Sequence, residues 1–274
     1  MRVGVLGATG RMGRAACRAI LAAGDLELTV AVAGNESAGH ELRELLPEGP
    51  AGLRVRAAPQ DLVDAKAEVV VDFSVPEATM AAARLLLPAG VHLVSGTTGL
   101  PASGMGELRD LAAVEGSGNV VWAPNFALGA VLAQRFAAIA ARYYQDAEVI
   151  ELHHAGKADA PSGTALRTAR AIAAARAEGS GDQVALDRGQ PPARHRETVS
   201  GVRGGDVEGV RVHSVRLPGL VAHQEVIFGG QGEVLTLRHD SLDRSSFMPA
   251  VLLSVRAVPD RPGLTVGLEP LLDL

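Results

Sequence analysis

A glycine-rich turn near the start of the chain constrains the fold most strongly. A short apolar run, residues 3–6, leads at once to Gly7, Gly10 and Gly13 and then to a segment of high helix propensity, residues 14–23. This order of strand, glycine turn and helix is typical of dinucleotide-binding folds, where the glycines permit a tight turn, close approach of a pyrophosphate and close helix packing. The spacing is G-x-x-G-x-x-G instead of G-x-G-x-x-G, so a glycine-rich turn in another kind of α/β protein is the alternative.

Strand and helix patterns alternate after this turn. Apolar, β-branched runs that predict strands occupy residues 26–33, 68–74, 91–95 and 119–123, with helix patterns over 76–87 and 106–114. The alternation predicts an α/β fold with a Rossmann-type, doubly wound parallel sheet.

The loops after these strands are the expected cofactor site, because ligands of such sheets bind outside the carboxyl ends of the strands. Asn35 and Glu36 follow the second strand, where an acidic residue commonly binds the adenosine ribose and a nearby Arg would accept a 2′-phosphate. Glu36 would repel that phosphate, so we expect NADH to serve at least as well as NADPH. The expected cofactor-binding residues are Gly7, Ala8, Thr9, Gly10, Arg11, Met12, Gly13, Asn35, Gly96, Thr97, Thr98, Ala123, Pro124, Asn125 and Phe126.

The second half of the chain has a different pattern. Three strand patterns, residues 210–217, 223–228 and 233–238, follow one another without intervening helices, which predicts an α+β domain with an open mixed sheet. We place the dinucleotide-binding domain at 1–126 and 241–274, and a substrate-binding and oligomerisation domain at 127–240. Residues 179–209 are expected to form a long loop, 247–258 a helix and 263–274 an extended tail.

One stretch, Glu151–Ala165, concentrates the chemistry. His153 and His154 would lie at the end of a strand that begins near Ala147, on opposite sides of its pleat. The helix that begins near Thr164 would carry Leu166, Ala169, Ile172 and Ala173 on one face. Its first backbone N–H groups, with the charge of Lys157, would form an anion site that favours a carboxylate. The alternative is a capped helix preceded by ordinary surface histidines, but His, His, Lys and a cap coincide here.

Composition excludes several other classes of protein. A formal charge of −5 argues against a general nucleic-acid binder. We find no signal-peptide pattern and no run of 18 apolar residues, so we expect a cytoplasmic protein without a membrane partner. The single Cys17 cannot form an internal disulfide, and adjacent histidines that point apart disfavour a metal site. No constellation supports a Ser or Cys nucleophile.

The stretch Glu151–Ala165 resembles the signature E-[LA]-H-H-x-x-K-x-D-A-P-S-G-T-A of the 4-hydroxy-tetrahydrodipicolinate reductase (dihydrodipicolinate reductase) family. The resemblance extends over essentially the whole chain, and residues 96–99 and 125–126 match segments that the family uses for its cofactor. It implies reduction of a cyclic imine dicarboxylate by NADH or NADPH, with loss of water, in lysine and diaminopimelate biosynthesis, and a homotetramer.

The resemblance also implies roles for individual residues. His153 matches the family's proton donor and Lys157 a second donor or charge stabiliser, while His154, Gly163 and Thr164 match substrate contacts. Arg216 and His223, on later strands, are as compatible with exposed strand positions as with the site. Two alternatives are a redox-sensing nucleotide-binding regulator, which would not need the His-His-Lys loop, and a dehydrogenase acting on an amino-acid semialdehyde. Turnover with substrate would separate the regulator from the enzyme.

Overall fold

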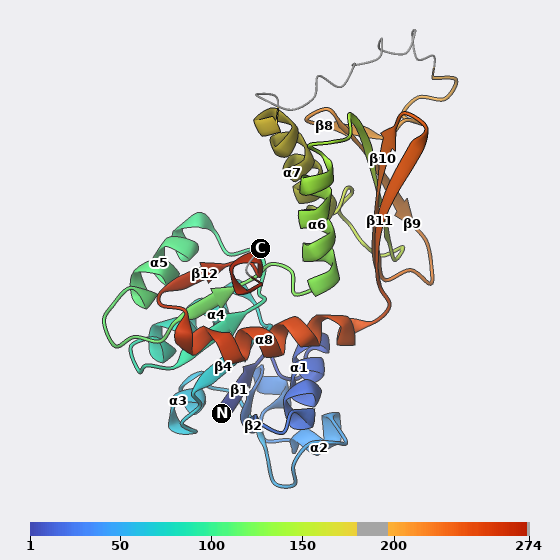
Figure 1. Ribbon diagram of the computed structural model, residues 1–274. Coiled ribbons are helices and arrows are strands. Elements are labelled where there is room, and N and C mark those ends of the chain that lie inside the picture. The colour runs from blue at the N-terminus through green and yellow to red at the C-terminus, as the bar shows by residue number, and fades with distance from the viewer. Residues whose placement is uncertain (180–196, 273–274) are drawn as a thin grey trace. The chain divides into compact units, whose positions relative to one another are not determined.

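The computed structural model describes residues 1–179 and 197–272. The chain divides into two compact units, Met1–Phe126 with Arg244–Leu274, and Ala127–Asp243. Each unit has its own sheet and its own helices (Figure 1). In the described ranges, no helix is long and apolar enough to cross a membrane.

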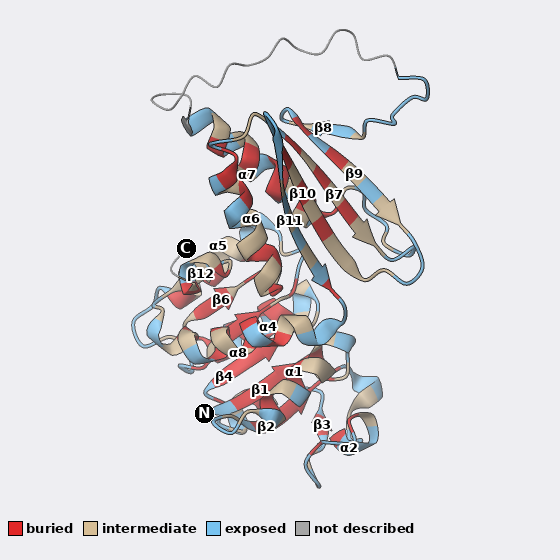
Figure 2. Ribbon diagram, turned by 45° about the vertical axis from the view of Figure 1, so that its right-hand side comes forward, coloured by how far each residue is buried: buried red, intermediate tan, exposed pale blue. Residues whose placement is uncertain are grey.

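The first unit is built on a seven-stranded sheet in the order β12-β6-β5-β4-β1-β2-β3, in which all neighbours run parallel. This confirms the predicted Rossmann-type sheet. Its central strands are buried on both faces, as the continuous apolar runs require (Figure 2). The strands are β1 (Arg2–Leu6), β2 (Glu27–Val32), β3 (Val55–Arg56), β4 (Val69–Asp72), β5 (His92–Ser95), β6 (Val120–Trp122) and β12 (Leu264–Val266).

Helices cover both faces of this sheet. Leu62 of α3, Leu86 of α4 and Leu108 of α5 form one apolar cluster with residues of the strands. The first helix, α1, contacts the last helix, α8, and α8 packs on β4 and β5. The helices are α1 (Arg11–Ala22), α2 (Leu42–Leu45), α3 (Gln60–Asp64), α4 (Pro76–Leu86), α5 (Ala102–Ala112) and α8 (Met248–Ala257), with short 3-10 turns η1 (Asn35–Ser37), η2 (Arg244–Phe247), η3 (Val258–Asp260) and η4 (Glu269–Leu271).

The second unit packs two helices on one face of a five-stranded sheet. The strand order is β11-β10-β7-β9-β8; β7 and β9 run parallel and the other neighbours antiparallel, so the sheet is mixed, as predicted. Val149, Ile172, Val226 and Phe228 lie in the core between helices and sheet. The elements are α6 (Leu128–Ala140), β7 (Asp146–His153), α7 (Gly163–Gly179), β8 (Gly205–Val207), β9 (Val210–Arg216), β10 (Ala222–Gly230) and β11 (Glu233–Ser241).

Three expectations from the sequence need correction. Within the predicted loop 179–209, residues 205–207 form the edge strand β8, while 180–196 lie outside the described residues. The predicted tail contains β12, which pairs with β6. Both strands have three residues and include a polar residue, so the sequence shows no continuous apolar run, and pairing with a neighbouring strand defines them. On the predicted face of α7, Ala169 and Ile172 are buried, but Leu166 and Ala173 are only half-buried, because the buried face also runs through Ala165.

Candidate active site

The glycine turn after β1 has the shape that a dinucleotide requires. Gly7 has a φ of +78°, and a Cβ at this position would lie 2.5 Å from the carbonyl oxygen of Phe73. A Cβ at Gly13 would lie 2.0 Å from the carbonyl oxygen of Gly7. Gly10 precedes α1 without a side-chain cap, so the first amides of the helix are left for an anion. These residues therefore fit the pyrophosphate of a nicotinamide nucleotide.

The other expected cofactor segments lie at the same edge of the sheet, because parallel strands end there together. A Cβ at Gly96 would lie 2.2 Å from the ring of Phe73, whose centroid is 5.7 Å from that of Phe126. The indole N–H of Trp122 donates to the carbonyl oxygen of Thr97 at 2.8 Å. The structure thus brings together the glycine turn and the segments 96–98 and 123–126.

Asn35 and Glu36 form the exposed 3-10 turn after β2, within the same unit. The next residue, Ser37, connects this turn to the glycine turn, because its hydroxyl lies 3.4 Å from that of Thr9. Arg14, which we did not predict as a site residue, donates from Nε to the carbonyl oxygen of Thr9 at 2.8 Å. A cation therefore lies beside the glycine turn, which Ser37 connects to the turn that carries Glu36.

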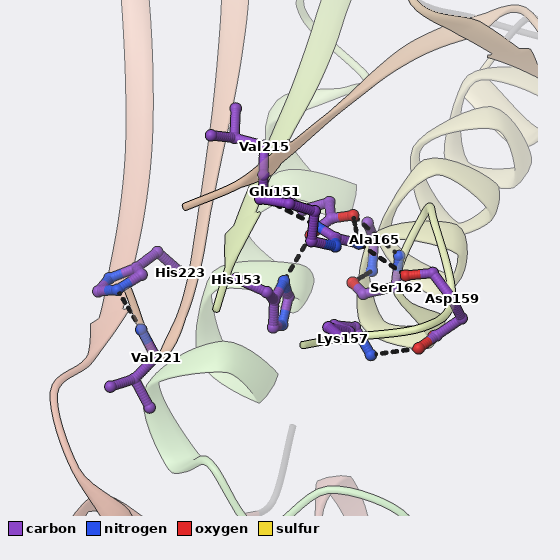
Figure 3. Close-up of polar contacts among 10 residues, drawn as sticks. Glu151, His153, Lys157, Asp159, Ser162, Ala165, Val215, Val221 and His223 are labelled. Atoms are coloured by element: carbon purple, nitrogen blue, oxygen red, sulfur yellow. Dashed lines mark hydrogen bonds and ion pairs between the residues drawn. The ribbon is translucent and has the colours of Figure 1, made fainter. Parts of the chain in front are cut away.

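In the second unit, His153 is part of a buried polar group (Figure 3). Its Nδ1 lies 2.5 Å from Oε2 of Glu151, a side chain with no exposed surface. Arg216 binds the same carboxylate through two nitrogens, with Nη1 2.9 Å from Oε2 and Nη2 2.7 Å from Oε1. The pairing of β7 with β9 creates this group, since it places His153 beside Arg216 on the same face.

The charges of this group explain its protonation. Burial raises the pKa of Glu151, but hydrogen bonds from Arg216, Ser214 and His153 outweigh it and hold that pKa below its usual 4.5. Burial lowers the pKa of His153 below 6.5; Glu151 opposes this shift, and the positive charge of Lys157 adds to it. With Nδ1 directed at a carboxylate, the proton that His153 exchanges is the one on Nε2.

The start of α7 supplies backbone donors next to this group. The N–H of Ser162 donates to Oε1 of Glu151 at 3.2 Å, and its hydroxyl caps the helix by accepting from the N–H of Ala165 at 3.1 Å. The N–H groups of Gly163 and Thr164 have no acceptor among the described residues. A Cβ at Gly163 would meet nothing closer than an Arg167 nitrogen at 3.7 Å, so the chain leaves space beside Gly163 at the start of α7.

Lys157 and His154 lie between β7 and α7, whereas His223 lies on β10. Nζ of Lys157 is 2.7 Å from Oδ1 of Asp159, in the loop before α7, and its side chain is mostly buried. His154 is exposed in the turn after β7. His223 pairs in register with Leu152 and therefore faces the side of the sheet opposite to His153, where its Nδ1 lies 2.7 Å from Asp240.

In this polar group, Glu151 was not predicted as a site residue, and Arg216 was left open between the site and an exposed strand position. Glu151 lies two positions before His153, so strand alternation places both on one face, and this spacing could have identified it. Arg216 was left open because its partner is 65 positions away in the sequence. In the ranges 1–179 and 197–272, no cluster of three or more His, Cys, Asp or Glu side chains could hold a metal ion.

Comparisons with known proteins cover the whole chain. Residues 1–126 match the family described as "Dihydrodipicolinate reductase, N-terminus", and residues 129–272 match "Dihydrodipicolinate reductase, C-terminus". A protein of Nocardia farcinica (strain IFM 10152) named 4-hydroxy-tetrahydrodipicolinate reductase is 52% identical over 274 residues, or 100% of this chain and 99% of the relative.

Two solved structures resemble this chain, one in both sequence and fold and the other in fold alone. A dipicolinate-bound dihydrodipicolinate reductase from Paenisporosarcina sp. TG-14 is 38% identical, with a TM-score of 0.81 and coverage of 98% of each chain. Aspartate semialdehyde dehydrogenase II from Vibrio cholerae has a TM-score of 0.52 at 13% identity, covering 94% of this chain and 98% of that one. The second likeness extends to the fold alone.

Proposed function

The chain belongs to the dihydrodipicolinate reductase family and carries out the NAD(P)H-dependent reduction of 4-hydroxy-tetrahydrodipicolinate in lysine and diaminopimelate biosynthesis, and we propose that His153 is its proton donor. The family assignment confirms the resemblance seen in the sequence. It also disfavours the two alternatives, a redox-sensing regulator and a semialdehyde dehydrogenase.

The single observation that carries the proposal is the buried group of His153, Glu151 and Arg216. Once the 4-hydroxy substrate has lost water, a bound nicotinamide nucleotide would supply a hydride to the conjugated ring, and the ring would then need one proton at the neighbouring carbon. His153 can hold that proton on Nε2, because its Nδ1 is bound to Glu151 2.5 Å away. Arg216 keeps Glu151 ionised, so Glu151 orients the imidazole and does not compete for the proton.

A dicarboxylate substrate requires an anion site next to this donor. We assign one carboxylate to the N–H groups of Gly163 and Thr164 together with the ammonium group of Lys157. Lys157 binds Asp159 in the present structure, so a substrate carboxylate would replace or share that partner. His154, exposed at the end of β7, is proposed as a further substrate contact.

The cofactor proposal concerns the edge of the first sheet. We assign the pyrophosphate to the glycine turn and the start of α1, and the nicotinamide to the loops after β5 and β6. Asn35 would bind the adenosine ribose. NADH is expected to be used at least as well as NADPH, because exposed Glu36 repels a 2′-phosphate, although Arg11 in the glycine turn, with Arg14 beside Thr9, offsets part of that repulsion.

Assembly and location are also proposals. The face of the second sheet opposite to α6 and α7 carries half-buried apolar side chains, Ile150, Leu152, Val215 and Ile227. A homotetramer would cover this face, and a reductase of amino-acid biosynthesis would work in the cytoplasm.

Steady-state kinetics of two variants test the proposed roles. His153→Gln should lower kcat by about 10²- to 10⁴-fold, the range for loss of a general acid, with little change in cofactor binding. Lys157→Ala should mainly raise the KM for substrate and weaken dipicolinate. His40→Gln, which removes an exposed histidine 2.9 Å from Glu44, is the control. Wild-type turnover by His153→Gln would exclude His153 as the donor.

A further inference from the structure

Asp72, the last residue of β4, is a carboxylate buried without an ion-pair partner. None of its surface is exposed, and within the described ranges no Lys, Arg or His binds it. Its partners are instead hydroxyl and amide donors. Oδ1 accepts from the hydroxyl of Ser74 at 2.5 Å and from its N–H at 3.0 Å, while Oδ2 accepts from the hydroxyls of Thr79 at 2.6 Å, Ser95 at 2.7 Å and Thr97 at 2.9 Å.

These partners suit the ionised form of Asp72. The hydroxyl oxygens of Ser95 and Thr97 already accept hydrogen bonds, from the N–H of Thr97 at 3.2 Å and the N–H of Ser74 at 3.1 Å. Their protons are therefore directed at the carboxylate, and a protonated acid would have to displace one of them. A buried charge satisfied by several donors is tolerated, whereas a half-satisfied one is costly.

The group ties together loops from several strands. Ser74 belongs to the loop after β4, Ser95 ends β5, and Thr97 follows it. The carbonyl oxygen of Thr97 accepts from the indole of Trp122, at the end of β6. The Phe73 carbonyl in the β4 loop lies so close to Gly7 that a Cβ there would be 2.5 Å from it. The Asp72 group therefore links the ends of β4, β5 and β6, and the β4 loop packs on the turn after β1.

We propose that Asp72 is a positioning residue for the nicotinamide nucleotide: its carboxylate holds Thr97 and the Phe73–Ser74 loop in the arrangement that receives the cofactor. The inference rests on the proposed cofactor role of this edge. Asp72 and Thr79 are both fully buried, so neither can touch a ligand. An effect of uncharged Thr79 on cofactor affinity would therefore pass through the loops, whereas the charge of Asp72 can also act at a distance.

Two variants of the full chain test this inference. Asp72→Asn keeps the size of the side chain but turns one acceptor into a donor that faces other donors. Thr79→Val removes the hydroxyl that donates to Asp72, together with its weaker contacts to the carbonyl oxygen of Val75 and the hydroxyl of Ser74, without a change of charge and with nearly the same volume. Asp25→Asn is the matched control, because Asp25 is an exposed carboxylate of the same unit that binds Arg256 at 2.8 and 2.9 Å.

Calorimetric titration with NADH, and separately with dipicolinate, gives the primary readout. Asp72→Asn should raise the Kd and KM for NADH at least tenfold and Thr79→Val at least threefold, with dipicolinate affinity and the control within twofold of wild type. The emission of Trp122, the only tryptophan of the chain, should shift in Asp72→Asn because its acceptor Thr97 moves. A purely structural role would change the melting temperature without this selective loss of NADH affinity.

The outcomes separate this inference from the proposed function. If the wild-type protein binds no nicotinamide nucleotide at this edge, the proposed function fails. If it binds NADH and both folded variants bind NADH within twofold of wild type, the positioning role of Asp72 is overturned. Should Asp72→Asn fail to fold, Thr79→Val decides: a Kd within twofold of wild type overturns the inference, and a threefold or greater loss supports it.

Discussion

Replacement of Glu151 by Gln should show whether the proton donor depends on a buried carboxylate. Gln has nearly the same shape, but it loses the charge that lies 2.5 Å from Nδ1 of His153. A hydrogen bond to a charged group contributes about 1.5–3 kcal/mol. If that energy serves to orient His153 and to stabilise its protonated form, kcat should fall about 10- to 100-fold, which corresponds to about 1.4–2.7 kcal/mol.

The pH dependence gives an independent readout. Burial lowers the pKa of His153 below 6.5, and the charge of Glu151 offsets part of this shift. Loss of that charge should therefore lower the pKa of His153 further. A general acid must be protonated, so activity is present below its pKa and is lost as the pH rises through it. The alkaline limb of the kcat/KM profile, which reports the free enzyme, should therefore move to lower pH in Glu151→Gln.

Stability must be measured in parallel, because the substitution also affects Arg216. Two of the hydrogen bonds of this guanidinium, to the carbonyl oxygens of Val215 and Asp159, survive the change. Its side chain is 19% exposed, so we expect a cost of about 2–4 kcal/mol, somewhat below that of breaking a fully buried pair. Kinetics should be run well below the melting temperature. Glu107→Gln, which removes an exposed carboxylate bound by two Arg84 nitrogens at 2.6 and 2.9 Å, should leave kcat and the pH profile unchanged.

A double-mutant cycle decides whether Glu151 acts through His153. In a His153→Gln background, Glu151→Gln should cause little further loss of kcat, because the group that it orients is already absent. Independent, multiplying losses in the double variant would refute the reasoning. So would a folded Glu151→Gln protein with wild-type kcat and an unshifted alkaline limb.

Two further predictions concern the ligands. Gly163→Ala should raise the KM for substrate and weaken dipicolinate binding severalfold without loss of stability, because a Cβ there meets no close protein atom but adds bulk beside the proposed carboxylate donors. Gly106→Ala, at a helical glycine with nothing within 4 Å of its Cβ position, is the control. An unchanged KM in Gly163→Ala would remove Gly163 from the site. NADH should equal or exceed NADPH in kcat/KM, and Glu36→Arg should shift the ratio toward NADPH. At about 5 Å and an effective dielectric of about 20, the repulsion between Glu36 and a 2′-phosphate is roughly 3 kcal/mol per charge pair. Even about 1 kcal/mol left after screening corresponds to about a fivefold preference for NADH. A wild-type preference for NADPH of tenfold or more would contradict this account of Glu36.

The parts of the fold that follow from local sequence were predicted well. The glycine turn could be read because a positive φ at Gly7 and a 2.0 Å approach at Gly13 tolerate no other residue. The central strands were readable because a parallel sheet buries both of their faces, which leaves continuous apolar runs. Strands β3, β8 and β12 have only two or three residues each and, unlike the equally short β6, no continuous apolar run, so they are defined by pairing with a neighbour.

The sequence by itself determined the local chemistry of this protein: a glycine turn, a strand that ends at His153, and a capped helix start preceded by Lys157. It could not decide which distant residues join that chemistry. Arg216 reaches Glu151 because β9 pairs with β7 in one register, while His223, on the neighbouring strand β10, faces the other way. Strand side chains alternate between the two faces of a sheet, so a register shift of one residue in β9 would turn Arg216 away from Glu151. The same shift in β10 would turn His223 toward the face that carries His153. Tertiary structure decided them, since a buried carboxylate is tolerated only where strand pairing brings it a cation or, as at Asp72, a set of donors.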